Sequence, residues 1–187
     1  EAKRPPPRTT ERAPVAKGLI PPATPLVACD PYFSVWSCDD LLAGDTPRHW
    51  TGATHSLADL IRVDGKPFRV MGVEPSGVPP LSQKSLDVLP TRTIYRFEGA
   101  GVELTLTFLT PALPEDLDLL SRPVTYVSWD VRAVDGKQHA VAVYFDASSA
   151  LVVNLPTQAV VWSTEKIGDL AAVKMGSKDQ PVLAKKG

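Results

Sequence analysis

Hydrophobic and polar residues alternate along several short segments of the chain, with the period of β-strands. In residues 101–110, Leu104, Leu106 and Phe108 alternate with polar residues at positions 103, 105 and 107. Because successive side chains of a strand point to opposite faces of its sheet, this segment is predicted to be a strand with one buried face. The same pattern in residues 124–134 places on one face Val127, Trp129, Val131 and Ala133.

Turn residues between the apolar runs predict hairpins. Asp64-Gly65 and Asp135-Gly136 tolerate the positive φ angles of a type I′ turn, and glycines bracket a third turn at residues 99–101. The segments that these turns are predicted to pair are 56–63 with 66–71, 91–98 with 101–110, and 123–134 with 137–147.

Strands with one apolar face are predicted to pack as two antiparallel sheets, so the fold class is all-β, an antiparallel β-sandwich. Residues 111–122 are expected to form a helical turn or an ordered loop, with Pro114 able to occupy a first helical position. Beyond Ala150 the strand pattern weakens, and the final sheet is expected to be incomplete. The predicted organisation is a Pro/Arg-rich lead-in over residues 1–23 and a sandwich region over residues 24–187.

Composition narrows the classes of function. The chain has 187 residues, of which 43% are hydrophobic and 19 are proline, and its formal net charge is −1. A balanced charge gives no field that would recruit nucleic acid, and the sequence lacks the run of about 18 apolar residues that predicts a membrane span. The chain begins at Glu1 with a flexible-looking segment, from which we expect a removed secretory signal peptide and a secreted or periplasmic location.

No phosphate-binding loop, dinucleotide fingerprint, nucleophile elbow or zinc-protease helix occurs in the sequence. Two cysteines, Cys29 and Cys38, are too few for a disulfide framework or a conventional zinc site, and they are either one disulfide or two free thiols. No cofactor and no metal are predicted. Glu115, Asp116 and Asp118 are interpreted as a solvated acidic loop rather than as paired catalytic carboxylates.

Aromatic and acidic residues gather between positions 29 and 54. Aromatic faces beside carboxylates suit a polar ligand such as a sugar, whereas the same residues can also be core and turn residues. His49 beside Asp45 or Asp40 is compatible with a metal cluster or a general base, but this spacing is not diagnostic. The acidic and aromatic members of the cluster are Asp30, Tyr32, Phe33, Trp36, Asp39, Asp40, Asp45 and Trp50.

Several contiguous stretches resemble, in order and approximate spacing, the N-terminal region of the glutaminase A family. Examples are His49-Trp50-Thr51-Gly52 and Asp135-Gly136-Lys137. The stretches that carry the resemblance are 24–27, 30–32, 36–37, 49–52, 61–66, 71–72, 89–91, 95–98, 116–124, 135–137 and 143–145.

This resemblance implies an N-terminal sandwich of the super-sandwich type that leans on a C-terminal toroid of helical hairpins, in a protein that converts L-glutamine to L-glutamate and ammonia. The catalytic groups are expected in the helical domain, so this chain alone is expected to be inactive and no catalytic residue is assigned. Its partner would be that helical domain of the same protein.

Two hypotheses of different classes therefore stand. In the first, the chain supports the catalytic domain of a glutaminase-like amidohydrolase, and Trp36, His49 and Trp50 form part of a cleft wall or ligand site, because sites are often built on loops held by a rigid scaffold. In the second, the chain is a carbohydrate-binding module, or part of a glycoside hydrolase of similar architecture. A sandwich cut from its partner domain is also expected to expose an apolar face and to self-associate.

Overall fold

The computed structural model describes residues 21–179, and this part of the chain is an all-β fold. The predicted lead-in over residues 1–23 falls almost wholly outside the described residues. The strands are β1 (Thr24–Ala28), β2 (Ser34–Ser37), β3 (Leu57–Val63), β4 (Lys66–Met71), β5 (Ser82–Leu89), β6 (Arg92–Gly99), β7 (Val102–Leu109), β8 (Tyr126–Ala133), β9 (Val141–Ala147), β10 (Val160–Ile167) and β11 (Leu170–Ser177).

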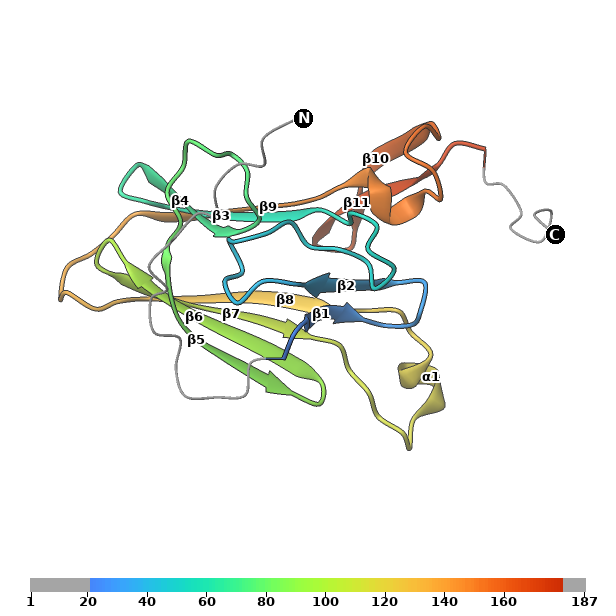
Figure 1. The fold of residues 1–187 in the computed structure, drawn as a ribbon, viewed down its shortest axis with the longest axis horizontal. Helices are drawn as coiled ribbons and strands as arrows, with labels where there is room; N and C mark the ends of the chain where they lie inside the picture. Colours follow the sequence, from blue (N-terminus) through green and yellow to red (C-terminus); the bar gives the residue numbers. More distant parts are fainter. Residues whose placement is uncertain (1–20, 180–187) are drawn as a thin grey trace, which may run out of the picture.

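Two antiparallel sheets form the body of the molecule, as predicted for a sandwich. One sheet has the strand order β4-β3-β9 and the other the order β5-β6-β7-β8. Two further pairs, β1-β2 and β10-β11, are separate two-stranded sheets. Figure 1 shows the two larger sheets as layers, with the hairpin β10-β11 projecting beyond one end.

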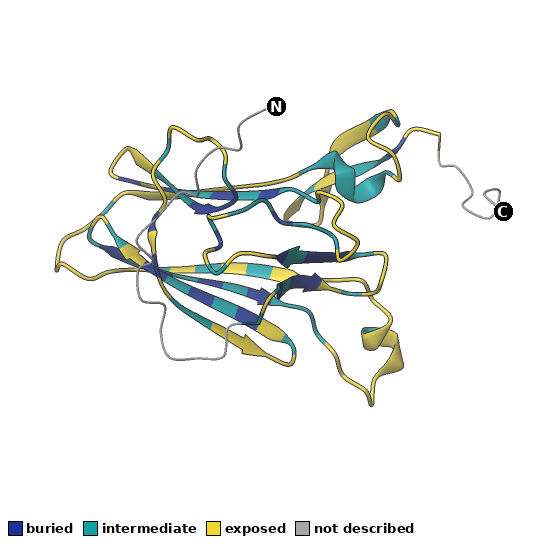
Figure 2. Ribbon diagram, viewed as in Figure 1, coloured by how far each residue is buried: buried dark blue, intermediate teal, exposed yellow. Residues whose placement is uncertain are grey.

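The hydrophobic core lies between the layers and draws residues from both. Ile61 of β3 and Leu104 of β7 are fully buried in the same cluster as Val35 of β2. Along β7 buried and half-buried positions alternate, which confirms the pattern predicted for Leu104, Leu106 and Phe108. Figure 2 shows the buried residues concentrated on the strands of the two layers and exposed residues covering the β10-β11 hairpin.

Two of the predicted hairpins are confirmed, and their turns have the expected backbone. Asp64 and Gly65 have φ angles of 49° and 83°, and β3 pairs with β4 across them. Ala100 and Gly101 have φ angles of 52° and 81° between β6 and β7. Residues with positive φ at both central positions give the twist that joins antiparallel strands tightly.

The third predicted hairpin is wrong. Strands β8 and β9 both exist, but β8 pairs with β7 and β9 pairs with β3, so the segment between them crosses from one sheet to the other. Only Gly136 of the Asp135-Gly136 pair has a positive φ angle, 77°, so the type I′ turn does not form. The carboxylate of Asp135 instead accepts hydrogen bonds from the backbone N–H of Lys137 and from the ring of His139.

The remaining predictions are met in part. A single helical turn, α1 (Leu117–Leu120), lies within residues 111–122, but its N-cap is Asp116 and Pro114 precedes it. Cys29 and Cys38 are both free. The strands β10 and β11 pair over their full length, yet most of their residues are exposed. In the described part of the chain, no helix is long and apolar enough to cross a membrane.

Candidate functional site

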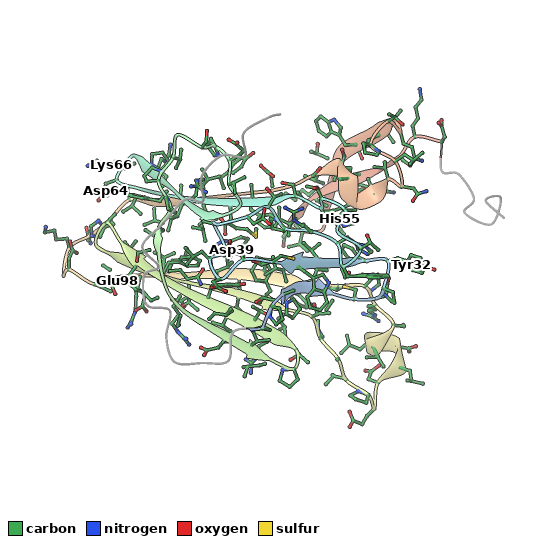
Figure 3. The ribbon with its side chains drawn as sticks, viewed as in Figure 1. Tyr32, Asp39, His55, Asp64, Lys66 and Glu98 are labelled. Atoms are coloured by element: carbon green, nitrogen blue, oxygen red, sulfur yellow. The ribbon has the colours of Figure 1, made fainter. Side chains whose placement is uncertain are left out.

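The loops beside β1 and β2 bring the predicted aromatic site residues together. Asp30 closes the turn after β1, because its carboxylate accepts hydrogen bonds from the backbone N–H groups of Tyr32 and Phe33 at 2.7 and 2.9 Å. This is the local turn chemistry expected of aspartate. Tyr32 is 86% exposed and points away from the body of the molecule (Figure 3), whereas Phe33 packs against the core.

A single backbone carbonyl, that of Pro31, holds the loop that contains His49 and Trp50. The indole Nε1 of Trp50 donates to it at 2.6 Å, and Nε2 of His49 lies 2.9 Å from it. Since a carbonyl only accepts, His49 carries its proton on Nε2, and Nδ1 accepts from the hydroxyl of Thr51 at 2.8 Å. Both ring nitrogens of His49 are thus used to fix the loop.

The backbone of the same loop is fastened to β2. Trp36 and Arg48 exchange backbone hydrogen bonds of 2.7 and 2.9 Å. Gly52 has a φ angle of 88°, which glycine adopts without strain, and its N–H donates to the carbonyl of His49 at 2.9 Å. The loop therefore presents its aromatic side chains from a backbone that is held at several points.

A surface hollow of about 330 Å³ lies between these elements. Trp36 and Trp50 are the aromatic residues of its lining, so the structure places two of the three predicted site residues at one hollow. The ring of His49 is not in the lining but lies 5.5 Å from the ring of Trp50. The lining residues are Ala28, Asp30, Pro31, Ser34, Trp36 and Trp50.

Two of the lining residues have a buried polar atom without a hydrogen-bond partner among the described residues, Ser34 Oγ and Trp36 Nε1. Nδ1 of His55, a residue outside the lining, is also buried without a partner in this part of the chain. Ser34 is only 4% exposed. Burial and the neighbouring His49 lower the pKa of His55, whose ring centroid lies 5.0 Å from that of His49. Buried polar groups ordinarily have partners, so this concentration marks the hollow as unusual.

The hypothetical interaction of His49 with a nearby aspartate, as a metal cluster or a general base, does not form. Asp45 instead receives hydrogen bonds from the guanidinium of Arg48, with the closest approach at 3.0 Å, and these hydrogen bonds lower the pKa of Asp45. Among the described residues, no group of three or more His, Cys, Asp or Glu side chains is arranged to hold a metal ion.

A second polar cluster ties two turns together at the far end of the sandwich. The ring of His139 contacts Asp64 through Nδ1 at 2.7 Å and Asp135 through Nε2 at 3.0 Å. Hydrogen bonds with these two carboxylates raise the pKa of His139, and the same bonds lower the pKa values of Asp64 and Asp135. Nothing in the sequence around His139 indicates that the turn at residue 64 lies beside it.

A third polar group lies inside the sandwich. Asp59 of β3 is 0% exposed, and one of its carboxylate oxygens accepts a hydrogen bond of 2.7 Å from the indole Nε1 of Trp129 on β8. The other oxygen, Oδ1, is buried without a partner. Burial raises the pKa of Asp59 to about 7.

Sequence reasoning singled out the aromatic residues of the hollow but missed Ser34 and the carbonyl of Pro31. A lone serine in a strand carries no pattern that distinguishes it from an exposed one. A backbone carbonyl is present at every residue, so its use as a shared acceptor is visible only once the loops are placed.

Two family models of unassigned function cover most of the chain. The model described as Domain of unknown function (DUF4964) matches residues 8–81, and the model described as Domain of unknown function (DUF5127) matches residues 91–187. Strand β3 of the first range pairs with β9 of the second, so the two matched ranges build one sandwich. Strand β5 lies between the two ranges.

Curated relatives carry glutaminase names. The chain is 35% identical over 137 residues to a protein of Aspergillus oryzae named "Glutaminase A", a match that covers 69% of this chain and 20% of the relative. It is 26% identical over 172 residues to a protein of Arthroderma benhamiae named "Probable glutaminase", covering 82% of this chain and 20% of that relative. The chain thus spans about a fifth of the length of these relatives. No solved structure matches it significantly.

Proposed function

Because the chain belongs to the DUF5127 family and corresponds to the N-terminal portion of glutaminase-named proteins, we propose that it is the non-catalytic β-sandwich of a glutaminase-like hydrolase. Its role is to support a catalytic domain that lies elsewhere in the full-length protein. The observation that carries this proposal is that the chain matches about one fifth of the length of relatives named as glutaminases.

The surroundings of the histidines support a structural role. Amide hydrolysis calls for a nucleophile and a base positioned to take its proton. The chain has three histidines. Both ring nitrogens of His49 are engaged in hydrogen bonds, with Pro31 and Thr51. Those of His139 are engaged in hydrogen bonds with Asp64 and Asp135. His55 has a buried Nδ1.

A direct comparison of activity tests the proposal. The 187-residue chain and the full-length protein would each be assayed for ammonia release from L-glutamine, with a panel of glycosides as alternative substrates. We expect turnover of glutamine by the full-length protein only. Glutamine hydrolysis by the isolated chain would overturn the proposal, and glycoside cleavage by the full-length protein would replace the substrate class.

Within this function, Trp36, His49 and Trp50 are proposed to form a wall beside the catalytic cleft. Support comes from the hollow that Trp36 and Trp50 line and from the loop that His49 fixes. Replacing His49 and Trp50 by alanine in the full-length protein is expected to change KM or kcat. Unchanged turnover together with unchanged stability would rule out the wall.

Ligand binding by the sandwich itself is the second candidate function. It is favoured by the unpartnered Ser34 Oγ and Trp36 Nε1 of the aromatic-lined hollow. Such a site suits a small polar ligand with an apolar face, for example a sugar ring. Quenching of tryptophan fluorescence by a panel of oligosaccharides and by L-glutamine would test it.

A matched pair of variants makes that test specific. Trp50 is 63% exposed at the hollow, and Trp162 is 71% exposed on the β10-β11 hairpin. Trp50→Ala is expected to abolish the ligand-dependent quenching and Trp162→Ala to leave it intact. Equal effects of both variants would assign the quenching to nonspecific contact.

A further inference from the structure

Strands β8 and β9 each end a sheet within the described residues. In the order β4-β3-β9 the last strand has one neighbour, and β8 is likewise last in β5-β6-β7-β8. All seven residues of β9 are exposed. An edge strand offers a row of unpaired backbone N–H and C=O groups, which folded proteins usually shorten, charge or cover.

The alternation of hydrogen bonds between β3 and β9 identifies which backbone N–H groups of β9 point away from β3. Asp64 donates its N–H to the carbonyl of Ala140, and Ser148 donates to the carbonyl of Ser56. In an antiparallel ladder hydrogen-bonded and non-hydrogen-bonded pairs alternate. The register then directs the N–H groups of Ala142, Tyr144 and Asp146 toward β3. The N–H groups that point away from β3 belong to Val141, Val143, Phe145 and Ala147.

The same reasoning applies to β8. Val134 donates its N–H to the carbonyl of Gly101, so the even-numbered residues of β8 bond to β7. The residues whose N–H groups point away from β7 are Val127, Trp129, Val131 and Ala133. These are the residues that the alternation of the sequence placed on the core-facing side of the strand.

Apolar side chains accompany both free edges. Val141, Val143 and Phe145 lie opposite Val63, Ile61 and Asp59 of β3, so they face the core side of the sandwich. They nevertheless remain 38%, 40% and 37% exposed. Across the gap between the sheets, the rings of Phe145 and Trp129 meet edge to face at 5.6 Å. The two edges thus bound one side of the sandwich, here named the open flank.

Backbone and side-chain features of the open flank together indicate the kind of partner it takes. A small ligand or a lipid surface would cover apolar side chains but leave eight outward N–H groups in two rows unpaired. Added β-strands satisfy those groups and bury alternate side chains at the same time.

We propose that the open flank binds β-strands from the polypeptide that follows this chain in the full-length protein, and that these strands extend both sheets from β8 and β9. The proposal rests on the proposed function, because it requires a longer protein. The curated relatives provide the necessary chain, since this sequence spans 20% of each of them. After β9 the chain continues through a short 3-10 helix (Ser149–Val152) into the β10-β11 hairpin, which carries the exposed Trp162 and Val173.

Hydrogen exchange tests the proposal amide by amide. The 187-residue chain and the full-length protein would be compared by exchange at single-residue resolution. We expect the amides of Val141, Val143 and Phe145 to exchange at least ~100-fold more slowly in the full-length protein, as for backbone groups that join a sheet ladder. The amides of Ala142 and Tyr144 are internal controls, since both bond to β3 with or without further strands.

Substitution by proline at one outward position provides the second measurement. Val143→Pro removes an outward N–H while sparing the ladder to β3, a position at which edge strands accept proline. In the full-length protein it is expected to raise the rate of proteolysis at least tenfold. Val143→Ala, which keeps the N–H, is expected to have a much smaller effect. The circular dichroism of the 187-residue chain should be the same for both variants.

Each result has a defined meaning. Equal exchange of the outward amides in the two proteins, with the 187-residue chain diluted until it is monomeric by light scattering, would overturn the proposal. An open reading frame that ends at Gly187 would overturn it as well. Protected amides in a full-length protein without glutaminase activity would refute the proposed function and leave this inference standing.

Discussion

Trp129 of β8 donates its indole N–H to the carboxylate of Asp59 on β3, and this 2.7 Å bond links the two sheets across the core. The contact joins residues 70 positions apart in the sequence. It also places an ionisable group where water does not reach it. The protonation of Asp59 is therefore coupled to the stability of the whole sandwich.

Replacing Asp59 should change how stability depends on pH. The folded pKa of about 7 lies above the usual value of 3.8, so the stabilising contribution is fully present below about pH 4 and is lost as the pH rises toward 7. Asp59→Asn, which keeps an acceptor for Trp129, is expected to raise the free energy of unfolding at pH 8 by roughly 1 to 3 kcal/mol. Urea denaturation at pH 5 and pH 8 measures this. A variant with the same pH dependence as the native chain would contradict it.

The cluster of His139, Asp64 and Asp135 has its own pH window. The raised pKa of His139 contributes stability that is present below about pH 6.5 and lost as the pH rises through the folded value. The lowered values of the two aspartates contribute above about pH 4 and are lost as the pH falls. His139→Gln should therefore lower the melting temperature more at pH 5.5 than at pH 8.

Lys137→Gln serves as the control for that variant. Its Nζ lies 3.7 Å from Asp135, but its side chain is 77% exposed, and an exposed ion pair contributes little. We expect its melting temperature to match that of the native chain at both pH values. An equal loss for the two variants would mean that the ring of His139 has no special part in joining the turns.

Two glycines with similar backbones should respond differently to alanine. Gly101 and Gly136 have φ angles of 81° and 77°, so each Ala variant carries a strain of about 1 to 2 kcal/mol. A Cβ at Gly101 would lie 2.6 Å from Nε2 of His139, whereas one at Gly136 would meet nothing within 4 Å. Gly101→Ala is expected to cost about 1 to 3 kcal/mol more than Gly136→Ala, measured by chemical denaturation. Equal losses would contradict the contact.

The exposed flank predicts self-association of the isolated chain. Val143 and Phe145 are 40% and 37% exposed beside free backbone edges, an arrangement that promotes edge-to-edge contact. Light scattering at increasing concentration should show particles larger than a monomer, and Val143→Lys should reduce them. Tyr144→Lys changes the opposite face of the same strand and should not. A clean monomer with a cooperative melt would contradict this expectation.

Local signals in the sequence predicted much of the fold, but they did not specify which strands pair. Asp64-Gly65 predicted its hairpin because a two-residue turn holds the strands on either side of it next to each other. The Asp135-Gly136 pair predicted a hairpin that does not form. Its carboxylate bonds the ring of His139, four residues further along the chain, and that ring is also held by Asp64, 75 positions away in the sequence.

The candidate site was predictable to a similar degree. Trp36 and Trp50 stood out by composition, and the structure places both at one hollow. The carbonyl of Pro31 and the hydroxyl of Ser34 could not be singled out, because their significance arises from where the loops meet. Asp59 was likewise not recognised as a buried carboxylate, since a charged residue on an alternating strand ordinarily faces solvent.

Strand β3 lies between β4 and β9, and β9 comes from the other of the two matched family ranges. A gene that acquired either range alone would encode a half-sheet with its apolar side uncovered. Recombination at their boundary would therefore be selected against, and the two ranges should be inherited together. In evolutionary terms they are one module, even though they have been described as two.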